Sequence, residues 1–251
     1  MMNILHSPLD QFKINVLSEI TVGEYEISIT NSTVFMLLSL LLIVLLLRST
    51  STLGNSINLG NVIGINLYQF LLKLVTDNIH GKEASKYFPF IYSLFLFILM
   101  SNLIGMIPYS FTITSHIVVT FGFSFTIFIA VTLIGLSKHG FHFFSFFVPA
   151  GAPKFLIPFL VIIEIVSYFS RAFSLGIRLF ANMMSGHSLL KILAGFSFSM
   201  IQIGGIFYIV QLVPLVIVFI VTGLELGVAL LQAYVFAVLT CMYLNDAINL
   251  H

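Results

Sequence analysis

The sequence predicts an all-α integral membrane protein with three transmembrane helices roughly perpendicular to the membrane, a surface amphipathic helix, and a long, strongly tilted helical hairpin. Composition is the first observation behind this prediction: 10 Lys and Arg and 9 Asp and Glu occur among 251 residues, whereas 59% of the residues are hydrophobic. The mean hydropathy of +1.11 is the second. Because too few polar side chains remain to cover a water-facing surface, most of the chain must contact lipid as a single membrane domain.

Three uncharged runs have the length of an ordinary transmembrane helix, since about 20 residues cross about 30 Å of hydrocarbon. They cover residues 27–47, 88–107 and 117–136. Pro108, with the Ser and Thr residues after it, predicts the turn between the second and third runs. A mildly amphipathic piece over 65–75 lies in a more polar region, so we expect it to rest on the membrane surface.

Two further apolar runs, over 155–194 and 200–244, are about twice as long as a transmembrane helix needs to be. A single helix of that length measures about 60 Å, so it must tilt far beyond the usual angle of about 20°. We therefore expect a steep helical hairpin, with Gly204, Gly205 and Pro214 bending its second arm. The alternative is two ordinary spans in each run, but the first run contains no strong turn pair.

Basic residues in the short loops predict the orientation, because Lys and Arg accumulate on the inner side of a membrane. The loops over 48–87 and 137–154 contain Lys or Arg, whereas the loop over 108–116 contains neither. Both basic loops are therefore expected to face inside. This arrangement leaves the N-terminal segment 1–26 outside and the C-terminal His251 inside.

Charge and motifs exclude several classes of function. A net charge of +1 without any cluster of Lys and Arg argues against nucleic acid as a partner. The chain has no phosphate-cradling loop, nucleophile elbow or zinc-protease motif, so we expect neither a catalytic site nor a cofactor. His139 and His142 lack a third ligand nearby, which argues against a metal site. No targeting signal is recognisable at the N-terminus, so we expect synthesis in the compartment where the chain inserts.

The few charged residues inside the apolar runs are regularly spaced. Glu164, Arg171 and Arg178 follow one another at intervals of seven residues, which places them on one face of a helix, and Asn182 extends that face by one turn. Charged groups at bilayer depth cost at least about 2.5 kcal/mol each, so those present usually face a protein interior or a water path. The first long run therefore carries a polar stripe.

The second long run carries Glu225 and, seven residues later, Gln232. A carboxyl group or a histidine such as His187 can exchange protons near neutral pH, but an arginine effectively cannot. Arg178 is therefore suited to hold a positive potential that makes a mobile carboxyl group release its proton and that blocks proton leakage. The alternative is that these groups are static interhelical pairs, and His187 alone is as compatible with polar packing as with a proton path.

Four segments resemble the subunit a family of F-type ATP synthases. The most specific is SLGIRLFANMMSGH over 174–187, and ELGVALLQAYV over 225–235 resembles the last helix of that family. NLIGMIP over 102–108 and SPLDQF over 7–12 extend the resemblance to nearly the whole chain. The pair of His187 and Glu225 resembles the mitochondrial members, whereas bacterial relatives often carry Glu and His at these positions.

The resemblance implies a proton-translocating stator subunit that lies beside a rotating ring of c subunits, each with one membrane-embedded carboxylate. It implies that Arg178 is the essential arginine between two offset half-channels, and that Glu164 lines the outlet toward the matrix. The residues that it assigns to the inlet from the intermembrane space are Glu225, His187, Asn182 and Gln232. Arg171 matches no essential position, so we interpret it as structural.

The resemblance also implies a location in the mitochondrial inner membrane, with the N-terminus in the intermembrane space and the C-terminus in the matrix. Other membrane-sector and peripheral-stalk subunits would be further partners. Two rival functions remain, a proton-coupled secondary transporter and a purely structural membrane subunit. A transporter is expected to show repeat symmetry and broken helices around a solute pocket, and the sequence shows no internal repeat.

Overall fold

The computed structural model describes residues 8–22, 25–51, 59–79, 83–107, 110–147, 155–205 and 207–249. Ser7, Pro108 and His251 of the sequence interpretation lie outside the described residues, as do parts of segment 1–26 and of the basic loops 48–87 and 137–154. Contacts divide the chain into two compact units. Unit 1 comprises Met1–Val44, Phe97–His116 and Leu179–Ala233, and unit 2 comprises Leu45–Leu96, Ile117–Arg178 and Tyr234–His251.

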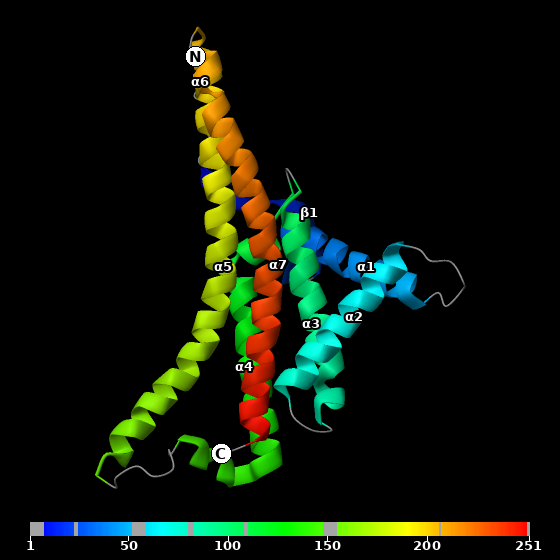
Figure 1. Ribbon diagram of the computed structural model, residues 1–251, viewed down its shortest axis with the longest axis vertical. Helices are drawn as coiled ribbons and strands as arrows, with labels where there is room; N and C mark the ends of the chain where they lie inside the picture. The colour runs from blue at the N-terminus through cyan, green and yellow to red at the C-terminus, as the bar shows by residue number, and fades with distance from the viewer. Residues whose placement is uncertain are drawn as a thin grey trace. The chain divides into compact units, whose positions relative to one another are not determined.

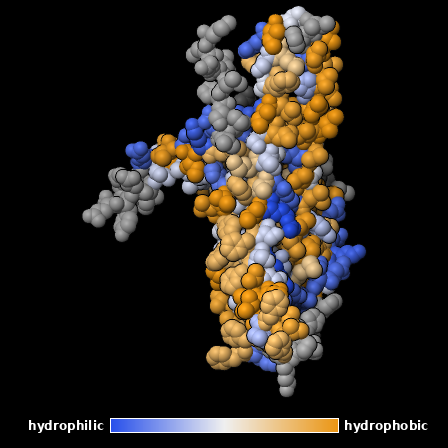
Figure 2. Space-filling view, turned by 90° about the vertical axis from the view of Figure 1, so that its left-hand side faces the viewer, coloured by the Kyte–Doolittle hydropathy of each residue, from blue (hydrophilic) through white to orange (hydrophobic). Residues whose placement is uncertain are grey.

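Long apolar helices dominate the described part of the chain, which confirms the predicted all-α membrane fold. Five segments among the described residues are long and apolar enough to cross a bilayer. The corresponding helices (Figure 1) are α1 (Asn31–Ser51), α3 (Glu83–Gly105), α4 (Ile117–His139), α5 (Ile157–Ile203) and α7 (Leu212–Ile248). They expose large apolar side chains, such as Phe219 at 82%, and hydrophobic residues, coloured orange, cover much of the face drawn in Figure 2.

A β-hairpin precedes the first membrane helix, and the sequence interpretation missed it. After a short 3-10 helix, η1 (Pro8–Phe12), strands β1 (Val16–Val22) and β2 (Tyr25–Thr30) pair antiparallel. Both strands are rich in β-branched residues, which favour extended backbone. Because β2 occupies positions up to Thr30, α1 begins at Asn31 and not at residue 27 as expected.

Asn31 joins the start of the hairpin to the start of α1. Its side-chain amide donates a hydrogen bond to the carbonyl oxygen of Lys13 at 3.1 Å, and its side-chain oxygen accepts one from the backbone N–H of Asn15 at 3.3 Å. Asparagine suits this position because its side chain supplies both a donor and an acceptor. The residues that follow η1 are thereby held beside the N-terminal end of α1.

The first long run is a single helix of 47 residues, α5, and it extends beyond the expected end at residue 194 to Ile203. Gly204 and Gly205 then adopt positive φ values of 74° and 66°. This left-handed conformation costs little only for glycine, so the glycine pair ends α5 instead of bending the second arm. Residues 200–203 therefore belong to the first arm, and the second consists of α6 (Phe207–Val210) and α7.

In unit 2, α4 and the first part of α5 pack closely because small residues lie between them. A Cβ atom on Gly176 would lie 3.2 Å from Cβ of Ser124 and 3.3 Å from Cα of Phe121. The Ser124 hydroxyl donates a hydrogen bond to the carbonyl oxygen of Ala172. Small residues and hydroxyl groups are the usual means by which membrane helices approach one another.

Helix α2 (Leu59–Asn78) is longer than the expected amphipathic piece over 65–75. Leu71, Val75 and Ile79 are almost fully buried, at 0%, 1% and 1% exposure, and their spacing of four residues places them on one face of the helix. Tyr68 adds an edge-to-face contact with Phe88 of α3, with ring centroids 5.1 Å apart. One apolar face of α2 is therefore packed within unit 2.

A 3-10 helix, η3 (Gly140–Phe147), follows α4 in unit 2. His139, at the junction, forms a hydrogen bond through Nε2 to the carbonyl oxygen of Ile248 at 2.8 Å. Near the end of α7, Cys241 is fully buried, so it is a core residue of this unit. The bond of His139 connects the end of α4 with the C-terminal end of α7.

Candidate functional site

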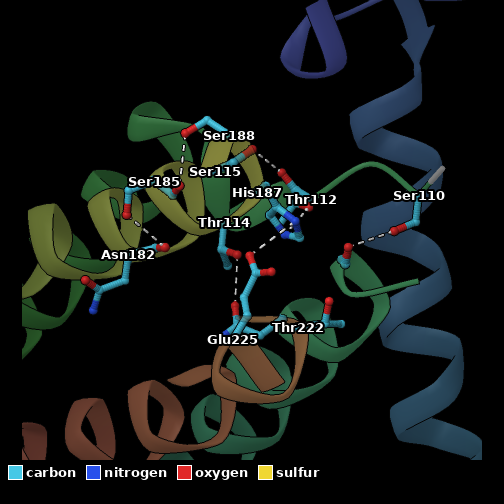
Figure 3. Close-up of polar contacts among 12 residues, drawn as sticks. Ser110, Thr112, Thr114, Ser115, Asn182, Ser185, His187, Ser188, Thr222 and Glu225 are labelled. Carbon is cyan, nitrogen blue, oxygen red and sulfur yellow. Dashed lines mark hydrogen bonds and ion pairs between the residues drawn. The ribbon is translucent and has the colours of Figure 1, made fainter. Parts of the chain in front are cut away.

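A buried carboxyl group and a histidine face each other in unit 1. Glu225 on α7 is only 3% exposed, and its Oε1 atom lies 3.3 Å from Nδ1 of His187 on α5. Figure 3 shows the two side chains pointing toward one another from their helices. No hydrogen bond from the described residues reaches either carboxyl oxygen of Glu225. Because burying an acid without donors is costly, this arrangement is typical of a functional group.

A glycine on α5 leaves the space that the Glu225 carboxyl group occupies. A Cβ atom on Gly186 would lie 2.5 Å from Oε1 and 3.0 Å from Cδ of Glu225. Any larger residue at 186 therefore has to displace the carboxyl group. Gly195, on the same helix, has no atom within 4 Å of its own hypothetical Cβ atom.

The resemblance noted in the sequence implies proton transfer at this pair, so we expect Gly186→Ala to lower proton translocation about ten- to a hundred-fold, because the new methyl group displaces the carboxyl group from His187. Thermal stability should be unchanged or slightly lowered, since the helical preference for alanine of about 1 kcal/mol offsets only part of an overpacking cost of about 1 to 3 kcal/mol. Proton pumping and the melting temperature of the purified complex measure the two effects. Gly195→Ala is the matched control and should leave pumping unchanged, whereas normal pumping by Gly186→Ala would show that the position of the carboxyl group is unimportant.

The segment over 110–116 packs against this pair. Oγ1 of Thr112 lies 3.1 Å from Nε2 of His187, so both ring nitrogens of the histidine have a polar neighbour. Thr112 is 5% exposed, and its carbonyl oxygen accepts a hydrogen bond from the Ser115 hydroxyl at 2.6 Å. Tight packing on the end of α3 also restrains Thr112, because a Cβ atom on Gly105 would lie 2.6 Å from its Cγ2 atom.

Asn102 on α3 connects three elements of unit 1. Its side-chain N–H group donates to the carbonyl oxygen of Ala229 on α7 at 3.3 Å, and its side-chain oxygen accepts a hydrogen bond from the Thr114 hydroxyl at 2.8 Å. Asn102 and Ala229 are both fully buried. Ala229 lies one turn beyond Glu225, so these bonds hold that part of α7 against α3 and the 110–116 segment.

A large cavity of about 810 Å³ in unit 1 reaches the buried pair. Glu225, His187 and Thr112 all line it. Other polar residues on its wall are Asp10, Gln11, Lys13, Asn15, Asn31, Ser110, Lys191 and Thr222. At this volume, with polar groups along its wall, the cavity can hold many water molecules. The ionisable pair therefore lies at the wall of a space that water can occupy, although both carboxyl oxygens of Glu225 are themselves buried.

Two other residues predicted for the inlet do not lie at this cavity. Asn182 on α5 and Gln232 on α7 are half-buried and belong to unit 1, but neither is among the residues that line the cavity in the described part of the chain. In Figure 3 the Asn182 side chain points away from the contact between His187 and Glu225. The structure thus brings together two of the four residues predicted for the inlet.

Unit 2 contains a second group of charged side chains, centred on Arg171. The guanidinium group lies 3.5 Å from Oε1 of Glu164 and 3.5 Å from Oδ2 of Asp246, and 5.8 Å from the ring centre of Tyr243. A cavity of about 20 Å³, enough for one water molecule, touches Arg171, Asp246 and Tyr243. Glu164, which the resemblance assigns to the outlet, is therefore not an isolated acid but forms an ion pair with Arg171.

Arg178 on α5, also in unit 2, differs from Arg171. Its side chain is exposed, and it forms no ion pair with any acid among the described residues. An arginine at bilayer depth without an acidic partner among the described residues is costly.

The sequence interpretation missed three polar residues that the structure places at these sites, namely Asn102, Thr112 and Asp246. Asn102 had a usable signal, because an asparagine inside the apolar run 88–107 is itself unusual. Asp246 lies just beyond the expected end of the last run, and Thr112 lies in a short polar loop. Polar residues are common at such positions, so the sequence gives no reason to select either one as a site residue.

Among the described residues no group of three potential metal ligands occurs, and this includes His116, His139 and His142. His116 lies between α3 and α4 and stacks on the ring of Phe111, with centroids 4.9 Å apart. Burial lowers the pKa of His116, which favours its neutral form.

Known proteins are similar to this chain over nearly its whole length. A family model described as ATP synthase A chain matches residues 31–245. A protein named ATP synthase subunit a from Marchantia polymorpha is 54% identical over 249 residues, which cover 98% of this chain and 99% of the relative. Proteins of the same name are 52% identical in Brassica napus, covering 99% and 98% of the two chains, and 48% identical in Rhodospirillum rubrum, covering 98% and 100%.

Proposed function

This chain belongs to the ATP synthase A chain family, and from that membership and the geometry of the site we propose that it is the proton-conducting stator subunit of the membrane sector. It is a non-catalytic subunit of an ATP synthase, and other subunits of that complex are its partners. Its proposed task is to pass protons to and from a rotating ring of c subunits through two offset half-channels.

The observation that carries this proposal is the buried pair of Glu225 and His187 at the wall of an 810 Å³ cavity. A carboxyl group and an imidazole at 3.3 Å can exchange a proton directly, and both residues lie at the wall of a cavity large enough for water. This geometry supports an inlet half-channel that ends at the pair. Asn182 and Gln232 are proposed to continue the inlet toward the ring.

Arg178 is the proposed barrier between the two half-channels. Its exposed guanidinium group, without an acidic partner among the described residues, is suited to face a carboxylate of the ring. A fixed positive charge favours the ionised form of a nearby carboxyl group and therefore promotes release of its proton. Since arginine does not lose its own proton, it cannot carry protons between the half-channels.

Glu164 is proposed to line the outlet, and the structure suggests how it is held. Arg171 pairs with both Glu164 and Asp246, and of these two acids Asp246 lines, with Arg171, a cavity that has room for a single water molecule. This pairing supports the structural interpretation of Arg171. In the proposed outlet, a proton released near Arg178 leaves past Glu164.

The proposed cycle begins when a proton passes from the inlet to a ring carboxylate. Neutralisation allows the carboxyl group to enter lipid, because charge there is costly. After nearly a full turn the group meets the outlet side, where Arg178 favours the anion and the proton leaves. Each elementary charge that crosses contributes about 2.3 kcal/mol per 100 mV of membrane potential, so several crossings must be summed for one phosphorylation.

We place this subunit in the mitochondrial inner membrane, with its N-terminus in the intermembrane space and its C-terminus in the matrix. The support comes from the plant relatives, from His187 and Glu225 at the family positions, and from the basic loops. A close bacterial relative shows that the family itself is not restricted to mitochondria.

Purification of the native complex tests the proposed function. We expect the chain to copurify with a ring of small hairpin proteins that carry membrane carboxylates, and we expect ATP hydrolysis by the complex to drive proton movement into vesicles. Copurification without proton movement would favour a structural membrane subunit. A chain that purifies alone and exchanges a solute for protons would favour a secondary transporter.

A further inference from the structure

We propose that Thr112 is a positioning residue for proton uptake, whose hydroxyl group holds the His187 ring against Glu225 while protons pass. The proposal rests on the proposed function, because it assigns a role within the same inlet. The observation behind it is the continuous contact from Oγ1 of Thr112 to Nε2 of His187 at 3.1 Å, and from Nδ1 of His187 to Oε1 of Glu225 at 3.3 Å.

A hydroxyl group suits this position because it can both donate and accept a hydrogen bond. When His187 is cationic, both ring nitrogens donate, and Thr112 accepts from Nε2–H. When His187 is neutral with its proton on Nδ1, the Thr112 hydroxyl donates to Nε2. In either state rotation of one O–H bond satisfies Nε2, so the ring keeps Nδ1 toward Glu225 without turning over.

The proton balance across the pair is simple. Protonated Glu225 transfers its proton to Nδ1 of neutral His187, which leaves a carboxylate and an imidazolium, and the reverse step restores the first state. In both of these states Nε2 carries a proton that it donates to Oγ1 of Thr112. The hydroxyl group is therefore a constant partner while the proton moves at the opposite side of the ring.

The surroundings hold Thr112 rigidly enough for this role. Its backbone carbonyl accepts from Ser115, and its side chain packs so tightly on Gly105 that a Cβ atom there would lie 2.6 Å from Cγ2 and 2.8 Å from Oγ1 of Thr112. Thr112 and Ser115 are 5% and 3% exposed. Gly105→Ala is therefore a second way to displace the hydroxyl group, because the new methyl group must push Thr112 away from His187.

Other charged groups also act on His187. Glu225 faces it from α7, Lys191 shares the cavity wall one turn further along α5, and Asp10 and Lys13 face the same cavity from the N-terminal segment. Asp10 and Lys13 pair with each other at 2.7 Å, so much of their effect cancels. Substitutions of Thr112 leave all these charges in place, which isolates the contribution of the hydroxyl group.

The test uses the complete ATP synthase reconstituted in vesicles, with ATP synthesis driven by a fixed potential and the pH on the inlet side varied. Thr112→Val keeps the side-chain volume but removes the hydroxyl group. We expect it to slow synthesis about tenfold near neutral pH, since a well-placed hydrogen bond to a charged group is lost. The pH of half-maximal uptake should fall by about 0.5 to 1 pH unit, because loss of this hydrogen bond destabilises the cationic form of His187 more than its neutral form.

Thr112→Ser should restore both the rate and the pH profile, and Gly105→Ala should reproduce the shift even if Thr112→Val fails to assemble. Thr126→Val, which alters an exposed hydroxyl on α4, is the control and should behave as the unmodified complex. An unchanged profile in Thr112→Val, or a serine variant as impaired as the valine variant, would overturn the role of Thr112. A normal rate in Glu225→Gln would instead remove the proposed inlet itself.

Discussion

Replacement of Arg178 by alanine is expected to abolish coupled proton translocation. A guanidinium group about 4 Å from a ring carboxylate contributes about 4 kcal/mol at an effective dielectric constant near 20, or roughly a thousand-fold in the proton affinity of that carboxyl group. Without it, a ring carboxylate that returns to the outlet side keeps its proton, and rotation stops. ATP-driven proton pumping in vesicles measures the loss, which we expect to exceed about a hundred-fold.

The control for this prediction is Arg178→Lys, because lysine restores the positive charge but can lose it when it is desolvated. We expect partial pumping at most, together with greater passive proton leakage than in the unmodified complex. Assembly should be checked by copurification with the ring, since an unassembled complex also fails to pump. Undiminished pumping by an assembled Arg178→Ala complex contradicts the barrier role.

The second large effect is expected for Glu225→Gln. Glutamine keeps the shape of the side chain but cannot exchange a proton with His187, and proton transfer by a positioned side chain typically contributes at least about a hundred-fold. We therefore expect proton uptake to slow by about that factor. Stability should not fall, because a neutral amide removes the cost of a buried acid that accepts no hydrogen bond from the described residues. ATP synthesis at fixed potential and the melting temperature measure the two effects.

Glu83→Gln is the matched control, because Glu83 lies in unit 2 and forms an exposed pair with Lys138 at 3.6 Å. Exposed pairs contribute about 0 to 1 kcal/mol, so both rate and stability should stay near those of the unmodified complex. Equal rates for Glu225→Gln and Glu83→Gln would exclude Glu225 from the inlet.

The two arms of the long hairpin, α5 and α6 with α7, show which structural features a local sequence pattern can predict. An apolar run with no proline after its first turn and no turn pair predicts one long helix, and α5, whose one proline is Pro158 at its second residue, is such a helix. The end of that helix was harder to predict, because Gly204 and Gly205 can either bend a helix or end it, and only their positive φ values decide between these outcomes. The hairpin of β1 and β2 was missed because pairing between strands is not a property of either strand alone.

Some features of the site could likewise be predicted from the sequence, and others depend on the tertiary structure. Ionisable residues in apolar runs can be recognised from the sequence because their cost in lipid is independent of the fold, and this cost singled out Glu164, Arg178 and Glu225. Spacing along one helix predicted a common face for Glu164 and Arg171, which form an ion pair. It could not predict that Arg171 also binds Asp246, since that residue comes from another helix.

Composition and hydropathy alone were enough to establish a helical membrane protein, because lipid permits few other ways to satisfy the backbone. They could not establish which side chains meet. The contact of Glu225 with His187, the placement of Thr112 behind the histidine, and the cavity that reaches them all join segments far apart in the chain. Such contacts depend on how α3, α5 and α7 pack, and packing depends on the shapes of all three helices at once.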